Sequence, residues 1–412
     1  MKKYILLLLC IVALTNCENA KTETQIESAG EFPIMAWIGV PEAETSVERF
    51  KELKESGINI NFSVYSSVEA VQKALDVAHE AGVKLMFSCP ELTSEPEKTA
   101  ERFMAHPALQ GYHLVDEPCA TAFPSLGEWV RRIQSVDKEH GCYINLLPTY
   151  ASAEQLLGKD FVLEEGEDPY AKYVELFLQE VPVPFISFDH YPVLEENGTR
   201  TLRQDWYKNL EIIAAASKES GLPFWAFSLA IAHKPYPIPT VSEIRLQMYS
   251  NLAYGAQALQ YFTYWHPGDT TIWDFHDSPI NIDGTRSVVY DRIKLVNQEI
   301  HALSGVFGGS KLVSVWHAGD QIPSGTNPLG ELPSQIKSLE IADGSALVSL
   351  LTKNERCFLV IVNRDLMEPM SFSIETDDTV GIVSKDAAVT PVGNGAEVGL
   401  APGDIAIFTW RQ

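Results

Sequence analysis

The chain has 412 residues, of which 45% are hydrophobic, so it can form one large core and a smaller second one. Its 55 acidic residues outnumber 31 basic ones, which gives a formal charge of −24. Such a surface repels nucleic acid and anionic lipid head groups, and it disfavours strongly acidic polysaccharides. We therefore expect a neutral ligand and no nucleic-acid partner.

The N-terminus has the pattern of a secretory signal. Lys2 and Lys3 precede an apolar run, residues 4 to 14, which ends in "LTNC" at Cys17. This stretch resembles a bacterial lipobox, which implies cleavage before Cys17 and a lipid on its thiol. Residues 1–16 would then be a signal peptide and residues 17–31 a flexible tether. We expect a lipid-anchored protein of the bacterial cell envelope, on the periplasmic face or the outer-membrane surface; the alternative is an ordinary signal with a chance cysteine.

The remaining cysteines show no metal-binding spacing. Cys89, Cys119, Cys142 and Cys357 lack CxxC pairs and companion histidines. We predict isolated thiols, with a Cys89–Cys119 disulfide left open, and we expect no metal and no cofactor.

Between residues 32 and 309 one pattern repeats: a short apolar run, a loop, and a predicted helix whose apolar residues recur every three or four positions. The eight strand-like runs cover residues 32–40, 60–66, 83–89, 111–117, 142–150, 184–192, 223–232 and 258–265. Eight strands alternating with helices predict a (β/α)8 TIM barrel. An open doubly wound sheet fits less well, because no glycine-rich loop follows the first run. Residues 310–412 alternate apolar and polar residues between turns, which predicts a small C-terminal β-sandwich.

Active sites of such barrels form where the strands end, so the ends of the eight runs supply the candidates. We predict three catalytic acids at these ends: Asp116, Glu117 and Asp189. The predicted substrate-binding residues are Trp37, Tyr65, Glu91, Asn145, His190, Tyr191, Trp225, His233, Tyr264 and Trp265. Carboxyl groups among flat aromatic rings suit carbohydrate chemistry, because sugar rings stack on aromatic faces and glycosidic cleavage uses two carboxyl groups.

The stretch "HLVDEP" resembles the Asn-Glu-Pro signature of glycoside hydrolase clan A. The segments "IPTVSEIRLQMYSNLAYGAQALQYFTYWHPG" and "VVYDRIKLVNQEIHAL" resemble the strand-eight region of family 42 type β-galactosidases. The resemblance implies that Glu117 is the general acid/base. Asp116 departs from the family's asparagine, and "FWAFSLAIAH" lacks the glutamate that serves as nucleophile at the end of strand seven.

Asp189 is therefore the predicted second acid. Facing Glu117 at roughly 6.5–9.5 Å it would act as the base of an inverting hydrolase, and near 5 Å as a nucleophile. Adjacent acids in a partly desolvated mouth raise the pKa of one of them, which keeps a general acid protonated. Glu243 lies in "TVSE", the spacing of a helix capping box, so we predict a structural role for it. His113 lies four residues before Glu117. Because side chains of a strand alternate between its two faces, we expect both on one face of the strand.

Three functions remain open at this stage. The first is a glycosidase that cleaves a neutral oligo- or polysaccharide, and the second is a glycan-binding protein on a barrel that has lost turnover. The third is a metal-dependent hydrolase using His113, Glu117, Asp189, His190 and His233, which the missing HxH on strand one disfavours. Each candidate also has a structural alternative: Asp189 could cap a helix, and Trp225 or Tyr264 could fill the barrel.

Overall fold

The computed structural model describes residues 25–268, 273–393 and 395–412. Eight parallel strands close into a barrel in the order β1-β10-β9-β6-β5-β4-β3-β2. The barrel strands are β1 (Ile34–Trp37), β2 (Ile60–Val64), β3 (Lys84–Ser88), β4 (Leu109–Asp116), β5 (Gly141–Leu146), β6 (Ile186–Phe188), β9 (Phe224–Leu229) and β10 (Ala258–Phe262). Each overlaps one of the eight predicted runs, with β4 and β5 beginning one or two residues before theirs, so the predicted TIM barrel is confirmed.

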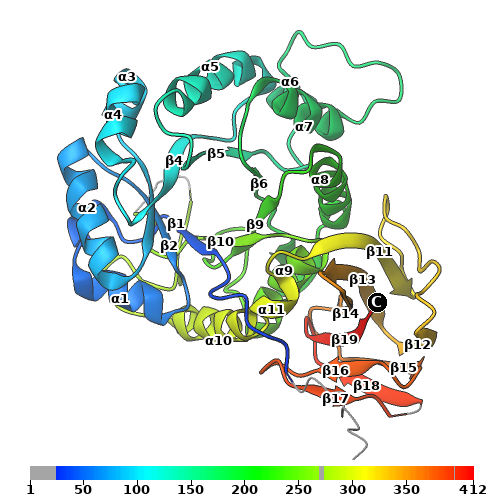
Figure 1. Ribbon diagram of the computed structural model, residues 1–412. Helices are drawn as coiled ribbons and strands as arrows, with labels where there is room; N and C mark the ends of the chain where they lie inside the picture. Colours follow the sequence, from blue (N-terminus) through cyan, green and yellow to red (C-terminus); the bar gives the residue numbers. More distant parts are fainter. Residues whose placement is uncertain (1–24, 269–272, 394) are drawn as a thin grey trace, which may run out of the picture.

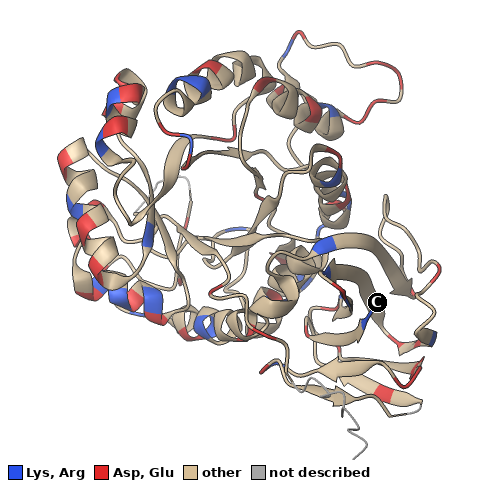
Figure 2. Ribbon diagram, viewed as in Figure 1, with Lys and Arg blue, Asp and Glu red and all other residues tan. Residues whose placement is uncertain are grey.

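Helices form a ring around the barrel (Figure 1). They are α1 (Val47–Glu55), α2 (Val68–Ala81), α3 (Pro90–Ser94), α4 (Pro96–Phe103), α5 (Phe123–Gln134), α6 (Ala153–Leu157), α7 (Pro169–Glu180), α8 (Trp206–Ser220), α9 (Val241–Ala253), α10 (Val288–Ala302) and α11 (Ser304–Phe307). Helix α2 illustrates how the sequence sets them: the Ser67 side chain caps its start, and Gly82 ends it with φ +68°. Acidic residues are spread over these outer helices and loops (Figure 2).

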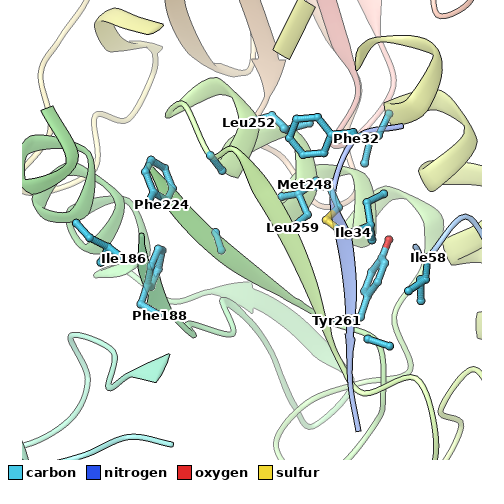
Figure 3. Packing of buried hydrophobic residues seen from close by; sticks show 14 of the residues in the cluster. Phe32, Ile34, Ile58, Ile186, Phe188, Phe224, Met248, Leu252, Leu259 and Tyr261 are labelled. Carbon is cyan, nitrogen blue, oxygen red and sulfur yellow. The ribbon is translucent and has the colours of Figure 1, made fainter. Parts of the chain in front are cut away.

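The layer between strands and helices is apolar. Figure 3 shows Phe32, Ile34 and Leu259 pointing toward Met248 and Leu252 of α9. All five side chains are almost completely buried, at 1% exposure or less. Burying an apolar side chain of this size contributes roughly 1.5–3 kcal/mol, so this layer holds the barrel closed and fixes where its strands end.

The C-terminal domain consists of two antiparallel sheets, as predicted. One has the order β11-β13-β14-β19-β16-β17 and the other β12-β15-β18. Their strands are β11 (Lys311–Gly319), β12 (Ile336–Asp343), β13 (Ser345–Lys353), β14 (Arg356–Asn363), β15 (Met370–Thr376), β16 (Gly381–Val383), β17 (Val389–Pro391), β18 (Ala396–Leu400) and β19 (Ile405–Arg411). Val348 and Leu350 of β13 face the second sheet, while Leu347 and Leu351 join the core of the barrel layer. The sandwich therefore packs directly on the barrel.

Polar contacts add to this interface between barrel and sandwich. Glu299 of α10 accepts hydrogen bonds from Tyr249 Oη at 2.6 Å and from Lys385 Nζ at 3.1 Å, and it pairs with Arg245. Ser349 Oγ of β13 donates to the backbone carbonyl of Ala253 at 2.6 Å. These contacts join α9 and α10 to the sandwich.

The segment before β1 differs from its prediction. We expected a flexible tether through residue 31, but the described residues 25–31 pack against the sandwich and α11. Ile26 is buried, and its backbone N–H donates to Ala387 O at 2.8 Å. Ser28 and Ser304 share a hydrogen bond of 3.0 Å. The predicted signal peptide and Cys17 lie outside the described residues. In the part of the chain that is described, no helix combines the length and the apolar character needed to cross a membrane.

Candidate active site

Three carboxyl groups meet at the ends of β4 and β6. Asp116 is the last residue of β4, Glu117 follows it, and Asp189 comes directly after β6. Asn145 of β5 lies between them: its side-chain Nδ2 donates to Asp116 Oδ1 at 3.2 Å and to Asp189 Oδ1 at 2.9 Å. One amide group therefore holds two of the three acids in place.

The amide is oriented by a polar layer inside the barrel. Ser187 Oγ of β6 donates to Asn145 Oδ1 at 2.9 Å, which leaves Nδ2 to face the carboxyl groups. Gln260 Nε2 of β10 donates to Ser187 Oγ at 2.9 Å, and Tyr143 Oη donates to Gln260 Oε1 at 2.7 Å. Strands on opposite sides of the barrel thus support the three acids.

The backbone of β4 explains how adjacent acids reach the same mouth. Next to β5, the register of β4 shifts between His113 and Val115, so that His113 pairs with Tyr143 and Asp116 with Asn145. This bulge brings Asp116 to the side that His113 occupies. Simple alternation therefore does not hold along β4 beyond His113.

Glu117 reaches the mouth by a turn of the backbone. Its φ is +47°, a left-handed conformation that costs a non-glycine residue of the order of 1 kcal/mol. Its N–H donates to Asn145 O at 2.9 Å, which holds the turn. The Glu117 side chain is exposed at the mouth, next to Asp116. Strain at a non-glycine residue beside buried acids is typical of functional sites.

Asp189 is buried beside the other two acids. Burial and then the charge of Glu117 act on its carboxyl group. The nucleophile and base roles of Asp189 depend on a spacing of about 5 Å or 6.5–9.5 Å from Glu117, and they stay predictions.

The pKa values of all three acids are raised. Burial raises the pKa of Asp189 well above its usual range, and the charges of Glu117 and Asp116 add to the effect. Partial burial, followed by the charge of Asp116, raises the pKa of Glu117 to about 7. Burial also raises the pKa of Asp116. Asp116 and Glu117 keep contact with solvent, which screens part of their repulsion, but the site still holds a protonated carboxyl group at neutral pH.

Beside Asp189, the predicted Tyr191 lies in a group with Tyr150, Tyr236 and Arg203, which the sequence did not single out. Arg203 stacks on the Tyr150 ring at 4.2 Å, donates through Nη2 to Tyr236 Oη at 3.1 Å, and donates through Nε to Tyr191 O at 3.2 Å. Arg203 follows the hairpin of β7 (Val193–Glu196) and β8 (Thr199–Leu202), an insertion between β6 and α8. The "ENGT" turn of this hairpin was the available signal.

Tyr191 and His233 lie close to this group, among aromatic rings. The Tyr191 ring is 5.6 Å from that of Phe262. The His233 ring lies 4.7 Å from Phe275 and 5.6 Å from Trp273, which is half-exposed. Burial lowers the pKa of His233 to about 4, so its ring is neutral at pH 7.

Other predicted residues are placed as follows. Trp37 is buried inside the barrel, with its ring 5.1 Å from that of His113. His113 is a packed core histidine, and burial lowers its pKa to about 3. Glu91 lies in the first turn of α3, with Oε2 buried. The His190 ring is buried, with Nε2 3.5 Å from Asp205 Oδ2.

Four predicted binding residues do not join the three acids. Trp225 is the second residue of β9, so it lies near the opposite end of the barrel, where it stacks on Phe185 at 4.0 Å. Tyr65, Tyr264 and Trp265 are buried in the layer between strands and helices. The sequence placed each near a strand end but did not reveal to which side of the strand it points.

Two further expectations concern Glu243 and the cysteines. Thr240 and Glu243 form the predicted capping box, with Glu243 Oε2 accepting from Thr240 N at 2.8 Å. Glu243 also pairs with Arg200 of β8 at 2.6 Å, so its structural role is confirmed. Cys89 and Cys119 are free thiols rather than a disulfide. Among the described residues, no group of three or more histidine, cysteine and acidic side chains is arranged to hold a metal ion.

Comparison with solved structures finds glycoside hydrolases. A family 42 β-galactosidase from G. stearothermophilus is 10% identical, with 95% of this chain and 100% of that chain covered and a TM-score of 0.60. A β-galactosidase from Bacillus circulans sp. alkalophilus is 9% identical, with coverages of 92% and 99% and a TM-score of 0.58. A family 39 glycoside hydrolase from Bacteroides cellulosilyticus WH2 is 12% identical, with coverages of 93% and 81% and a TM-score of 0.51. No protein-family model and no curated protein matches the sequence. The chain therefore has the fold of TIM-barrel glycoside hydrolases.

The substitution Glu243→Gln tests the role of Glu243. Glutamine can keep the capping box but loses the ion pair with Arg200, so we expect the free energy of unfolding to fall by about 1–2 kcal/mol. Thermal and urea unfolding measure this. Once a substrate is in hand, turnover should stay within about twofold of the parent, whereas loss of a nucleophile would remove at least about 10³-fold.

The substitution Asp189→Asn should stabilise the protein at neutral pH. Because the pKa of Asp189 is higher in the folded than in the unfolded state, its favourable contribution is present below the unfolded pKa and is lost as pH rises through the folded pKa. Asparagine keeps an acceptor for Asn145 without that penalty. We expect the melting temperature to rise by roughly a few degrees at pH 7, with a smaller difference near pH 4. A lower melting temperature at pH 7 would contradict the raised pKa.

Proposed function

We propose that the protein is a glycoside hydrolase that cleaves O-glycosidic bonds of a neutral oligo- or polysaccharide. The observation that carries the proposal is the group of three carboxyls at the ends of β4 and β6, in which Glu117 has a pKa of about 7. A general acid works best when its pKa lies near the working pH. The fold shared with glycoside hydrolases supports the same reaction class.

In this proposal Glu117 donates its proton to the oxygen of the departing sugar. Asp189 supplies the third carboxyl group of the site, and Asn145 holds it from the side of β5. The aromatic residues around Tyr191 and His233 supply faces on which sugar rings can stack. The negative surface of the chain favours neutral over acidic sugars. Membership of family 42 is part of the proposal and is supported by the motif around Glu117 and the shared fold.

A second candidate is a non-catalytic glycan-binding protein. The observation in its favour is the end of β9, where Leu229 is followed by Ala230 and Ile231 and no carboxyl group takes the nucleophile's place. The two candidates differ in one result: only a hydrolase loses turnover when the Glu117 carboxyl is removed.

We also propose that the protein is anchored to the bacterial cell envelope through a lipid on Cys17. The support is the sequence from Lys2 to Cys17. In this arrangement the sandwich, residues 310–412, is a buttress of the barrel, since Ser349 and Leu347 of β13 contact the barrel layer.

Glu117→Gln should abolish hydrolysis of aryl glycosides with poor leaving groups, with a loss of about 10²–10⁴-fold in kcat/KM. Substrates with a dinitrophenyl leaving group need little proton donation, so the variant's loss of kcat/KM on these substrates should be much smaller. Glu128→Gln, on the exposed face of α5, is the matched control and should leave both rates unchanged. Equal losses on the two kinds of substrate would exclude Glu117 as the general acid.

The pH profile should report the titration of Glu117. Because the acid must be protonated, kcat/KM should fall as pH rises through about 7. Asp116→Asn removes a charge that raises the pKa of Glu117, so the alkaline limb of the remaining activity should move to lower pH. The profile of both proteins on one aryl glycoside measures this, and an unmoved limb would show that the Asp116 charge has no influence on the acid.

A further inference from the structure

The site lacks the usual partner of its general acid. A retaining glycosidase needs a carboxylate about 5 Å from the acid, and an inverting one leaves room for water at 6.5–9.5 Å. Asp189 is buried and held by Asn145, and the end of β9 carries only Leu229, Ala230 and Ile231. The nucleophile that attacks the sugar must therefore come from elsewhere.

A substrate can supply it. When C2 of the sugar carries an acetamido group, the carbonyl oxygen of that group can attack C1 of the same ring, as in the substrate-assisted glycosidases. The attack is intramolecular, so it needs no separate nucleophile from the protein. The protein must supply an acid for the leaving oxygen and a carboxylate that accepts the amide N–H as it gains positive charge.

We propose that this site hydrolyses glycosides of 2-acetamido-2-deoxy sugars, with Glu117 as the acid and Asp116 as the acceptor of the acetamido N–H. The inference rests on the proposed glycosidase function and names its substrate class. Asp116 directly precedes Glu117, and both face the mouth because of the bulge in β4 and the left-handed turn at Glu117. It is the residue at which the sequence departs from the asparagine of the clan A signature.

The contacts of Asp116 fit this role. Among the described residues Asn145 is its hydrogen-bond donor, bound to Oδ1, and Oδ2 remains to accept an N–H from the substrate. The Asp116 side chain is exposed at the mouth, as is that of Glu117, whereas Asp189 is buried. Asp116 and Glu117 are thus the two acids that a substrate can reach directly.

The surroundings also suit an acetamido group. Tyr191 follows Asp189 by two residues, and burial followed by the charge of Asp189 raises its pKa well above the usual range, so its hydroxyl keeps the proton that it can donate to a carbonyl oxygen. Its ring packs against Phe262 at 5.6 Å and Phe227 at 6.3 Å, so apolar faces lie beside the hydroxyl for the methyl group.

The reaction balances in two steps. First the carbonyl oxygen forms a bond with C1, the bond from C1 to the glycosidic oxygen breaks, and that oxygen takes the proton of Glu117, while Asp116 holds the cationic N–H. Then a water oxygen bonds to C1, its proton passes to Glu117, and the bond from C1 to the carbonyl oxygen breaks to restore the acetamide. The product keeps the configuration of the substrate, and no co-reactant other than water is consumed.

The first test compares matched 4-nitrophenyl β-glycosides that carry either an acetamido or a hydroxyl group at C2, in the gluco and galacto series, with the full mature chain. We expect kcat/KM to be at least 10³-fold higher for an acetamido substrate than for its 2-hydroxy partner. Equal or faster turnover of the 2-hydroxy substrates would overturn the inference and leave the glycosidase function standing. Turnover of none of them would count against both.

The second test uses Asp116→Asn and a stable 1,2-fused thiazoline analogue of the cyclic intermediate. We expect the parent to bind the analogue at least 100-fold more tightly than Asp116→Asn, as measured by calorimetry, with similar melting temperatures showing that the variant folds. Replacing the acetamido hydrogens by fluorine weakens the carbonyl nucleophile, so kcat/KM should fall stepwise from one to three fluorines. Equal binding by parent and variant, or a flat fluorine series, would overturn the inference.

Discussion

The site depends on one constraint: three carboxyl groups are held closer together than their charges favour. Asn145 makes this arrangement stable by donating to Asp116 and Asp189 at once. Burial, followed by the charge of Asp116, raises the pKa of Glu117 to about 7. A general acid in its protonated form is thus a consequence of burial and crowding together, and it comes at the expense of folding stability near neutral pH.

The rest of the barrel supplies the geometry that this crowding needs. Ser187 and Gln260, from strands on other parts of the barrel wall, fix the orientation of the Asn145 amide. The bulge in β4 and the positive φ of Glu117 bring two adjacent residues to one mouth, where a regular strand would separate them. The apolar layer under the helices and the packed sandwich keep the strand ends in place while the mouth carries strain and like charges.

Much of the fold was predictable from the sequence, because it follows from patterns that repeat. Eight apolar runs alternate with amphipathic helices, and the C-terminal strands alternate with a period of two. The three acids and Asn145 were found because they end such runs. The capping box at Thr240 and Glu243 was found because its mechanism is local.

What the sequence did not reveal depends on contacts between distant residues. The bulge that changes the side of β4 on which Asp116 lies arises from pairing with β5. Glu117 and Asp189 come together at one mouth only because β4 and β6 are both strands of the closed barrel. Trp225 was misplaced because an apolar run does not mark where its strand begins. Arg203 reaches Tyr150 through an inserted hairpin, whose direction no local pattern sets.

The most direct test of this account is to count the carboxyl protons in the resting protein at pH 7. Carbon-13 NMR of protein labelled at the Asp and Glu carboxyl groups, with Glu117→Gln and Asp189→Asn for assignment, separates protonated from ionised groups. The account predicts a shared proton on the Glu117 and Asp189 pair that is lost only as the pH rises through about 7 or above. Full ionisation of both groups by pH 5 would contradict it, because the mouth would then hold no general acid.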